Sequence, residues 1–344
     1  MSSRRRLPAL LVGVVLCALA WAGSPGAAAR TPSNVRASLD WHACADLPED
    51  APTTFECATV EVPRDYSRPN GRQITLALTR LPAKDAANRI GSLFFNFGGP
   101  GGDGVSSLQA ISARYDPLNR RFDLVGFDPR GVGQSSPAID CAVNQETDGI
   151  YAQPFPTPDN LDVDALVARD RAYVERCVER NADILPYVST ANVARDMDVL
   201  REAVGDSRLT YLGFSYGTTL GATYAAMFPT HFRSMVLDGA FSADQYVNQP
   251  LESLREYTAG FERALDRFLH ACAAHQDACK GFGGEDPWTA LDELVERANA
   301  QPLPVTGDNP RPVDGDDILA AANQSMFAKK LWPGLAKALA QAQA

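Results

Sequence analysis

The apolar residues in the first part of the chain form short runs that predict β-strands. Two β-branched and apolar runs, residues 55–62 and 72–80, lie on either side of Pro69-Asn70-Gly71, a sequence typical of a turn. We therefore expect an antiparallel hairpin here. Four later runs are almost continuously apolar, which is typical of strands buried on both faces of a parallel sheet; they span residues 92–97, 122–127, 209–213 and 234–237.

Segments with helical spacing of apolar residues separate the later strands. The clearest are residues 192–204 and 218–227, which lie between the last three predicted strands. Strands that alternate with helices indicate a doubly wound α/β sheet. The sequence thus predicts an α/β fold over residues 40–245, in which a hairpin precedes a mostly parallel sheet.

The pattern changes after about residue 246. Three segments, residues 251–272, 287–300 and 316–342, carry apolar residues at helical spacing, and strand patterns disappear. We therefore expect residues 246–344 to form an all-helical cap.

The N-terminus has the pattern of a secretory signal peptide. Three arginines at positions 4–6 precede an apolar run over residues 7–22, and three alanines follow at positions 27–29. We expect residues 1–29 to be cleaved and the mature protein to be secreted. The apolar run is shorter than the roughly 20 residues that span a membrane, and no later run is long enough. No membrane-spanning segment is therefore expected.

Composition and charge narrow the class of protein. The chain has 344 residues, of which 45% are hydrophobic and 22% charged, and such values are typical of a folded globular protein. Its formal net charge is −10 at pH 7, and residues 1–29 contain three arginines and no acidic residue, so the mature chain is more acidic still. A basic groove would oppose this charge, and we expect no nucleic-acid partner.

Seven cysteines are present, and six of them follow the predicted signal peptide. An even number of cysteines in an exported protein favours disulfides. Zinc binding is the alternative, but no pair has CxxC spacing and no histidine stands at ligand spacing from two cysteines, so we expect no metal. Pairing of nearest neighbours in the sequence is our hypothesis: Cys44–Cys57, Cys141–Cys177 and Cys272–Cys279.

The pentapeptide Gly213-Phe214-Ser215-Tyr216-Gly217 has the G-x-S-x-G pattern and lies directly after a predicted strand and before a predicted helix. In that position the two glycines permit a sharp turn that exposes the serine hydroxyl. The N-terminus of the following helix favours a developing oxyanion. We expect Ser215 to be a catalytic nucleophile; the alternative is a glycine-rich packing turn with a buried serine.

A glycine-rich segment, residues 96–102, follows an earlier predicted strand. A loop of this kind can direct a backbone N–H at the carbonyl oxygen under attack, and the residue after the nucleophile supplies a second N–H. We expect Gly99 and Tyr216 to supply these two groups, which together form an oxyanion hole.

The same segment also fits another class of protein. Gly99, Gly101 and Gly104 have the spacing of a dinucleotide-binding fingerprint, and Asp128 stands near the end of the next strand. However, Pro100 stiffens the loop, two strands precede it, and a nucleotide cofactor is not expected outside the cell. We therefore favour a hydrolase without a cofactor, with a dinucleotide enzyme as the alternative.

Three segments together resemble one known family. Residues 96–102, residues 126–135 and residues 213–239 are similar to the secreted tripeptidyl aminopeptidases, which are α/β-hydrolases related to proline iminopeptidases. The resemblance covers the chain from about Trp41 to its end. It implies the α/β-hydrolase fold and a serine exopeptidase that releases tripeptides or short peptides from substrates with a free N-terminus. It also implies that Asp128 and Arg130 shape the loop beside the site.

In this family the catalytic serine is followed by an aspartate and then a histidine, both on loops after the cap. None of the four histidines of the chain fits the role of the base. His231 directly precedes the strand after the Ser215 helix, which places it about five residues, or roughly 16 Å, along the sheet from Ser215. The other three lie before the first predicted strand (His42) or in the predicted cap (His270 and His275).

Asp238 ends a predicted strand at the same edge as Ser215, but the resemblance places the acid later. We therefore assign neither acid nor base and expect the C-terminal strands that carry them to be missing from this chain. Two alternatives to an active aminopeptidase remain: a carboxylesterase of the same fold, and a truncated, non-catalytic fragment. The cap also offers carboxylates for a substrate's ammonium group, at Glu252, Glu256 and Glu262.

Overall fold

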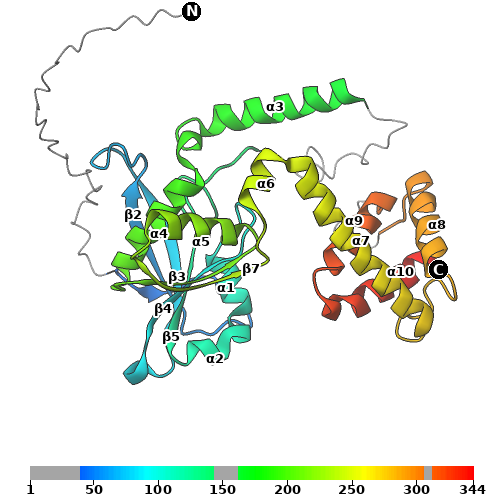
Figure 1. Cartoon of the computed structure of the whole chain (residues 1–344), viewed down its shortest axis with the longest axis horizontal. Helices are drawn as coiled ribbons and strands as arrows, with labels where there is room; N and C mark the ends of the chain where they lie inside the picture. Colours follow the sequence, from blue (N-terminus) through cyan, green and yellow to red (C-terminus); the bar gives the residue numbers. More distant parts are fainter. Residues whose placement is uncertain (1–38, 143–161, 306–311) are drawn as a thin grey trace, which may run out of the picture. The chain divides into compact units, whose positions relative to one another are not determined.

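The computed structural model describes residues 39–142, 162–305 and 312–344, so the predicted signal peptide, residues 1–29, lies outside the described residues. The described residues contain a seven-stranded sheet with the strand order β1-β2-β3-β5-β4-β6-β7 (Figure 1). Its strands are β1 (His42–Ala43), β2 (Glu56–Pro63), β3 (Gln73–Leu81), β4 (Gly91–Asn96), β5 (Phe122–Phe127), β6 (Leu209–Phe214) and β7 (Phe232–Asp238).

The predicted antiparallel hairpin is confirmed. β2 pairs with β3 in a register that sets Glu56 opposite Arg80. Alternate residues of β2, namely Ala58, Val60 and Val62, are buried, as expected for a strand with one face on a core. β3 then pairs antiparallel with β5 and joins the hairpin to the rest of the sheet.

The predicted parallel strands are also confirmed. β5, β4, β6 and β7 are neighbours in this order, and every pair among them is parallel. Their bounds agree with the predicted ones to within two residues. β1 was not predicted, because two residues are too few to show an alternation of apolar and polar positions. His42 therefore lies in a strand and not before the first one.

The helices of the described residues follow the predicted alternation, and none of them is long and apolar enough to cross a membrane. The helix predicted over residues 192–204 begins earlier, because the Ser189 side chain accepts the N–H of Asn192 and caps it. The helices are α1 (Val105–Ile111), α2 (Asp116–Asn119), α3 (Val163–Asn181), α4 (Thr190–Ala203), α5 (Tyr216–Met227), α6 (Ala243–Asn248), α7 (Pro250–Ala274), α8 (Pro287–Ala300), α9 (Gly315–Ser325) and α10 (Trp332–Gln343).

The two faces of the parallel strands carry separate hydrophobic clusters. On one face, Phe94 of β4 belongs to a cluster with Met197 of α4 and Tyr224 of α5. On the other face, Phe95 belongs to a cluster with Leu108 of α1. Successive residues of a strand point to opposite faces, so the continuously apolar runs are buried on both. Helices α4 and α5 thus cover one face, and α1 covers the other (Figure 1).

Helix α3 was not predicted. Its residues are mostly polar, and its side chains Val163, Val167 and Val174 are 56%, 50% and 54% exposed. Apolar residues recur at helical spacing in a sequence only when one face of the helix is buried. The start of α3 is fixed instead by Asp162, whose side chain accepts the N–H of Ala165.

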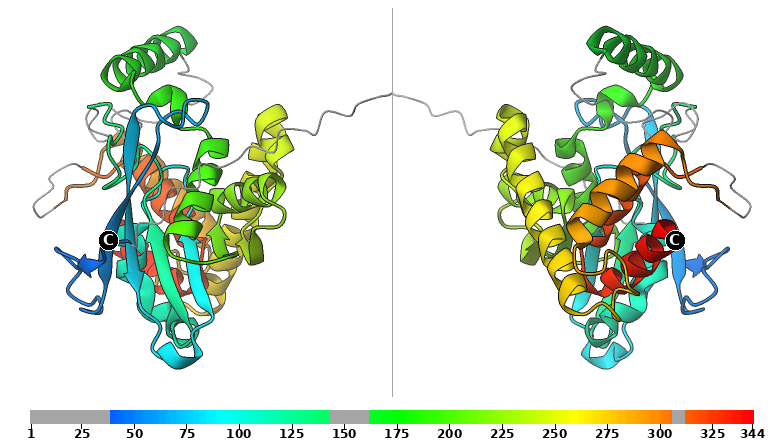
Figure 2. Two further views of the ribbon diagram at one scale, coloured as in Figure 1. Left: turned by 90° about the vertical axis from the view of Figure 1, so that its left-hand side faces the viewer. Right: turned by 90° about the vertical axis from the view of Figure 1, so that its right-hand side faces the viewer.

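After β7, the described ranges 239–305 and 312–344 contain helices joined by turns, and their only β-pairing is an isolated bridge between Leu303 and Val313. Helices α7 to α10 have their own hydrophobic cluster, which includes Phe268, Leu291 and Leu335. Figure 2 shows α7, α8 and α10 beside one another. The division of the chain into a core over residues 40–245 and a cap over 246–344 stays a prediction.

One predicted helical segment, residues 316–342, is divided in two. Helix α9 ends at Ser325 and α10 begins at Trp332, with a short 3₁₀ turn, Lys329–Leu331, between them. Pro333 stands at the start of α10, where proline is favoured because the missing N–H would have no partner there. The apolar spacing continues across the break, which is why the sequence alone suggested a single segment.

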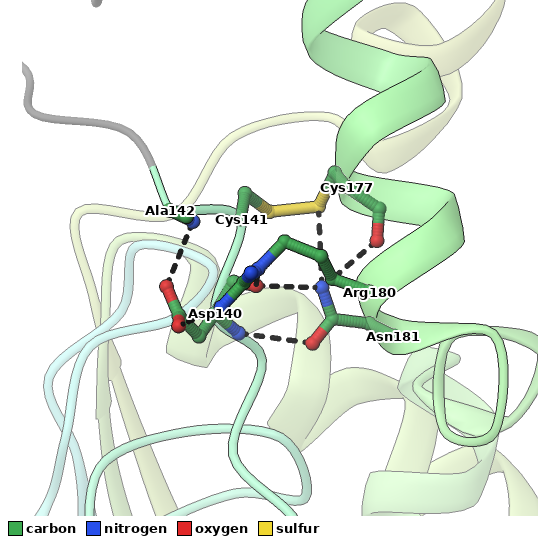
Figure 3. Close-up of a disulfide and its surroundings, with 6 residues drawn as sticks. All are labelled: Asp140, Cys141, Ala142, Cys177, Arg180 and Asn181. Carbon is green, nitrogen blue, oxygen red and sulfur yellow. Dashed lines mark hydrogen bonds and ion pairs between the residues drawn. A yellow bond between two sulfur atoms is a disulfide. The ribbon is translucent and has the colours of Figure 1, made fainter.

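The predicted disulfides are confirmed by the structure. Cys44–Cys57, Cys141–Cys177 and Cys272–Cys279 are bonded, with Cα–Cα distances of 5.0, 4.3 and 5.2 Å. Figure 3 shows the second of these, which joins the segment after β5 to α3. Beside it, the Asn181 side chain accepts the N–H of Asp140 at 3.0 Å and donates to the Asp140 carbonyl at 3.0 Å.

Candidate active site

Ser215 lies alone between β6, which ends at Phe214, and α5, which begins at Tyr216. Its backbone has φ 52° and ψ −123°, a conformation that costs a non-glycine residue free energy and is characteristic of functional turns. Its side chain is exposed. The alternative of a packing turn with a buried serine is therefore wrong.

The two glycines of the pentapeptide are required by close backbone contacts. A Cβ atom on Gly213 would lie 2.5 Å from the carbonyl oxygen of Gly217. A Cβ atom on Gly217 would lie 2.7 Å from the carbonyl oxygen of Asn96. Both distances are below any normal contact, so the turn forms only because these positions have no side chain. The second contact also brings the end of β4 against the turn.

The glycine-rich loop after β4 lies directly against Ser215. A Cβ atom on Gly98 would lie 3.0 Å from Cβ of Ser215 and 3.3 Å from the backbone nitrogen of Tyr216. The loop is held at its start by the buried side chain of Asn96, whose Oδ1 accepts the N–H of Gly98 at 3.1 Å. A further bond joins the Gly102 N–H to the Gly98 carbonyl at 3.1 Å.

Two backbone N–H groups, one in the glycine-rich loop and one directly after Ser215, are available to a ligand. Within the described part of the chain, neither the Gly99 N–H nor the Tyr216 N–H donates a hydrogen bond. The Tyr216 group belongs to the first turn of α5, where the helix dipole adds partial positive charge. An exposed hydroxyl with a free N–H group on the next residue can form a tetrahedral adduct and stabilise its oxyanion. The part of the Gly99 N–H in such a site stays a prediction.

The side chain of Tyr216 has a partner on another helix. Its hydroxyl and the Thr190 hydroxyl lie 2.8 Å apart, which ties the first residue of α5 to the first residue of α4. A second tyrosine supports the turn from β6: the buried Tyr211 hydroxyl donates to the Gly217 carbonyl at 2.8 Å. Burial raises the pKa of Tyr211 above its ordinary value, so this group stays a donor.

A family model described as the alpha/beta hydrolase fold matches residues 93–279, more than half of the chain. The chain belongs to this family. The matched range contains most of β4, all of β5, β6 and β7, the glycine-rich loop and Ser215. The α/β-hydrolase fold expected from the sequence is thereby confirmed.

Three relatives of this α/β-hydrolase are informative. It is 43% identical over 218 residues to a tripeptidyl aminopeptidase of Streptomyces coelicolor, covering 62% of this chain and 40% of that protein. It is 36% identical over 295 residues to the serine protease Hip1 of Mycobacterium tuberculosis, covering 83% and 55%. It is 37% identical over 346 residues to a protein named carboxylesterase B of the same species, covering 96% and 64%.

These relatives confirm the resemblance to the tripeptidyl aminopeptidases and support the expected enzyme class, a serine hydrolase. The chain spans about half the length of the curated relatives that it matches.

None of the described residues forms a hydrogen bond with the Ser215 hydroxyl. The His231 carbonyl accepts the N–H of Leu209, the first residue of β6, while Ser215 follows the last residue of that strand. The structure thus places His231 at the opposite end of β6, as expected. The remaining histidines make other contacts: His42 with the Asp40 carbonyl, His270 with Asp266 and the ring of Trp288, and His275 at the end of α7.

Asp238, the last residue of β7, lies beside the turn formed by residues 213–217. Its backbone carbonyl accepts the N–H of Ser215 at 2.9 Å, and its side chain is exposed. This bond helps to fix the turn, but in the described residues no histidine is joined to the Asp238 carboxylate. The structure therefore gives no support to Asp238 as the acid of a triad.

Asp128 and Arg130, in the loop after β5, are both buried. Asp128 accepts three backbone N–H groups, from Gly104, Val105 and Gln134, and burial raises the pKa of its carboxyl group against the effect of these bonds. A dinucleotide enzyme needs an acidic residue that can reach a ribose hydroxyl, and Asp128 is 1% exposed. The structure therefore does not support the dinucleotide alternative.

Arg130 forms a fully buried ion pair with Asp196 of α4, with N···O distances of 2.7 and 2.6 Å. The Tyr66 hydroxyl donates to the same carboxylate at 2.7 Å. Asp196 and Thr190 were not predicted from the sequence as supporting residues of the site. The sequence pattern could have indicated Asp196, because it lies on the same helix face as the buried Val193 and Leu200. An acidic side chain that is buried on such a face requires a partner.

Proposed function

We propose that this chain is a secreted serine hydrolase that forms an acyl-enzyme on Ser215, and that it acts as an aminopeptidase on peptides with a free N-terminus. The observation that carries the proposal is the exposed Ser215 in a strained turn, next to the free N–H group of Tyr216 and against the glycine-rich loop that contains Gly99. The peptide substrate is supported by the names of two relatives, a tripeptidyl aminopeptidase and a serine protease.

In the proposed reaction, Ser215 Oγ attacks the carbonyl carbon of the scissile peptide bond. Negative charge then develops on the carbonyl oxygen, and the Gly99 and Tyr216 N–H groups stabilise it. A base takes the Ser215 proton and passes it to the leaving amine, and the acyl group remains on Ser215. Water then releases the acyl group as the carboxylic acid and returns a proton to Ser215. No step requires a metal or a cofactor. Ser215 needs a proton acceptor, and we assign none among the described residues.

A carboxylesterase is the second candidate, and one comparison favours it. The relative named carboxylesterase B matches over 96% of this chain. Esters and amides are cleaved by the same nucleophile and the same oxyanion hole, so the geometry around Ser215 serves both reactions. The choice between them depends on how the substrate is held.

Labelling with a fluorophosphonate probe tests the nucleophile. We expect the wild-type chain to be labelled and Ser215→Ala to remain unlabelled. Thr219→Ala is the matched control, since Thr219 lies on the same helix and should keep the label. A wild-type chain that does not react would contradict the proposed activity and support the alternative of a non-catalytic fragment.

A substrate panel then separates the two candidates. We expect release from tripeptide amides with a free N-terminus, no release from the same peptides with an acetylated N-terminus, and slow turnover of short acyl esters. Cleavage of blocked peptides or of esters alone would exclude the aminopeptidase and favour the esterase.

We also propose that the protein is exported. The predicted signal peptide and the three disulfides support this, since disulfides persist in oxidising compartments. Expression of the whole chain in a bacterial host should give extracellular protein whose N-terminal residue is Arg30. Recovery of the chain only inside the cells, with residues 1–29 still attached, is the result that would refute export.

A further inference from the structure

The proposed oxyanion hole depends on a segment with little means of holding its own shape. Residues 98–104 contain five glycines and one proline. Glycine has more conformational freedom than any other residue, and a donor of an oxyanion hole must stay within a fraction of an ångström of its working position. Groups outside the segment must therefore hold the Gly99 N–H in place.

One anchor is found at each end of this segment. At its start, Asn96 Oδ1 accepts the Gly98 N–H. At its end, Asp128 Oδ1 accepts both the Gly104 N–H at 2.8 Å and the Val105 N–H at 2.9 Å. Hydrogen bonds to a carboxylate are stronger than those to a neutral acceptor, so the second anchor is the stronger one.

Close backbone contacts show that the end of the segment is built around this carboxylate. A Cβ atom on Gly104 would lie 2.2 Å from the Phe127 carbonyl oxygen, and one on Gly126 would lie 2.2 Å from the Gly104 carbonyl oxygen. A Cβ atom on Gly133 would lie 2.3 Å from Asp128 Oδ2. Three glycines thus clear the space in which Asp128 meets the first turn of α1.

Asp128 is itself fixed from the opposite side. Its N–H donates to the Ala77 carbonyl of β3 at 3.0 Å, and its carbonyl accepts the Ser135 hydroxyl at 2.6 Å. Its second oxygen, Oδ2, accepts the Gln134 N–H at 2.8 Å. The carboxylate therefore transmits the rigidity of the sheet to the glycine-rich segment.

We propose that Asp128 is a positioning residue of the active site, which keeps the Gly99 N–H directed at the oxyanion by anchoring the first turn of α1. This inference rests on the proposed function, because it assumes that Gly99 supplies an oxyanion donor. A carboxylate that only stabilised the fold would give the same contacts, so the test must separate reactivity from stability.

The informative variant is Asp128→Asn. It preserves the size of the side chain, but an amide has only one acceptor oxygen. Its NH₂ group must therefore face either the Gln134 N–H or the N–H groups of Gly104 and Val105, and two donors then oppose each other. Asn119→Ala is the matched control. It removes a buried amide group that donates to the carbonyls of Leu81 and Phe122, and among the described residues it has no hydrogen bond with Asp128 or with residues 98–105.

Two measurements on the whole chain decide the matter. We expect amide hydrogen exchange over residues 98–105 to be about tenfold faster in Asp128→Asn, because fewer bonds hold the segment. We expect fluorophosphonate to label folded Asp128→Asn at least tenfold more slowly than the wild type, since loss of one oxyanion donor alone slows reactions about 100-fold or more. Asn119→Ala should lower the melting temperature and leave both quantities close to the wild type.

Unchanged exchange over residues 98–105 in both Asp128→Asn and Asp128→Ala, which removes both acceptor oxygens, would overturn the anchor. An unchanged labelling rate in both folded Asp128 variants would overturn its positioning role. Equal losses of labelling in Asp128→Asn and Asn119→Ala would also overturn it, because reactivity would then follow stability. A wild-type chain that is not labelled refutes the proposed function itself, and exchange then still decides whether Asp128 anchors the segment.

Discussion

At the scale of single residues, the candidate site depends on positions where a side chain is absent. Ser215 can adopt a positive φ because Gly213 and Gly217 leave room for the sharp turn around it. Because these glycines have no side chain, β4, β6 and α5 approach one another closely, and Gly98 of the glycine-rich loop contacts Ser215. The exposure of one hydroxyl thus depends on backbone contacts between three elements.

The substitution Gly217→Ala tests this dependence. Its methyl group would lie 2.7 Å from the Asn96 carbonyl oxygen and 2.8 Å from Asn96 Oδ1, so we expect a loss of about 1–3 kcal/mol in the free energy of unfolding. Urea unfolding followed by circular dichroism measures it. Gly260→Ala is the control, because nothing lies within 4 Å of its Cβ in α7, and it should stabilise by up to about 1 kcal/mol. Equal effects of the two substitutions would contradict the close contact.

At the scale of elements, a buried polar network joins parts of the chain that the sequence leaves unconnected. Asp196 of α4 receives hydrogen bonds from Arg130, in the loop after β5, and from Tyr66, between β2 and β3. Arg130 also donates to the carbonyls of Pro63 and Tyr187. Each of these groups would be costly to bury alone, so the network forms only when the three elements assemble together.

We expect Arg130→Met to lower the free energy of unfolding by about 3–5 kcal/mol, because it leaves the Asp196 carboxylate buried without its cation. Replacement of both partners, Arg130→Met with Asp196→Leu, should restore part of this loss. Arg169→Met breaks a pair whose side chains are 42% and 70% exposed, and such a pair contributes only about 0–1 kcal/mol. The network would be energetically unimportant if Arg130→Met behaved like Arg169→Met in urea unfolding.

At the scale of the whole molecule, each disulfide joins two cysteines that follow one another in the sequence, with no other cysteine between them. Cys141–Cys177 joins residues 36 positions apart, while Cys44–Cys57 and Cys272–Cys279 join residues 13 and 7 positions apart. A cross-link removes conformations from the unfolded chain, and it removes more of them when the closed loop is longer. The three disulfides should therefore differ in their contribution to stability.

Replacing each cysteine pair by serine in turn tests this order. On the chain-entropy account, we expect losses of about 4 kcal/mol for Cys141–Cys177, about 3 kcal/mol for Cys44–Cys57 and about 2 kcal/mol for Cys272–Cys279. Thermal and urea unfolding of the three variants provide the values. The reverse order would show that contacts in the folded state, and not loop closure, determine what each disulfide contributes.

The sequence by itself was sufficient to predict six of the seven described strands, the hairpin, the sharp turn at Ser215 and the disulfide pairs. Each of these is a local property, because it depends on residues close together in the sequence: a run of apolar residues, a G-x-S-x-G pentapeptide, or neighbouring cysteines. The exclusion of His231 also followed from the sequence, since parallel strands share one direction. Helix α3 was missed because its apolar side chains are exposed and carry no burial signal.

Only the tertiary structure decided how the site is supported. Asp128 and Gly104 are 24 positions apart, Thr190 and Tyr216 are 26, and Arg130 and Asp196 are 66. Apolar spacing reports which face of an element is buried, but it does not report which polar group of another element lies opposite. That choice is made when the elements pack, because a buried carboxylate or N–H group is stable only where a partner meets it.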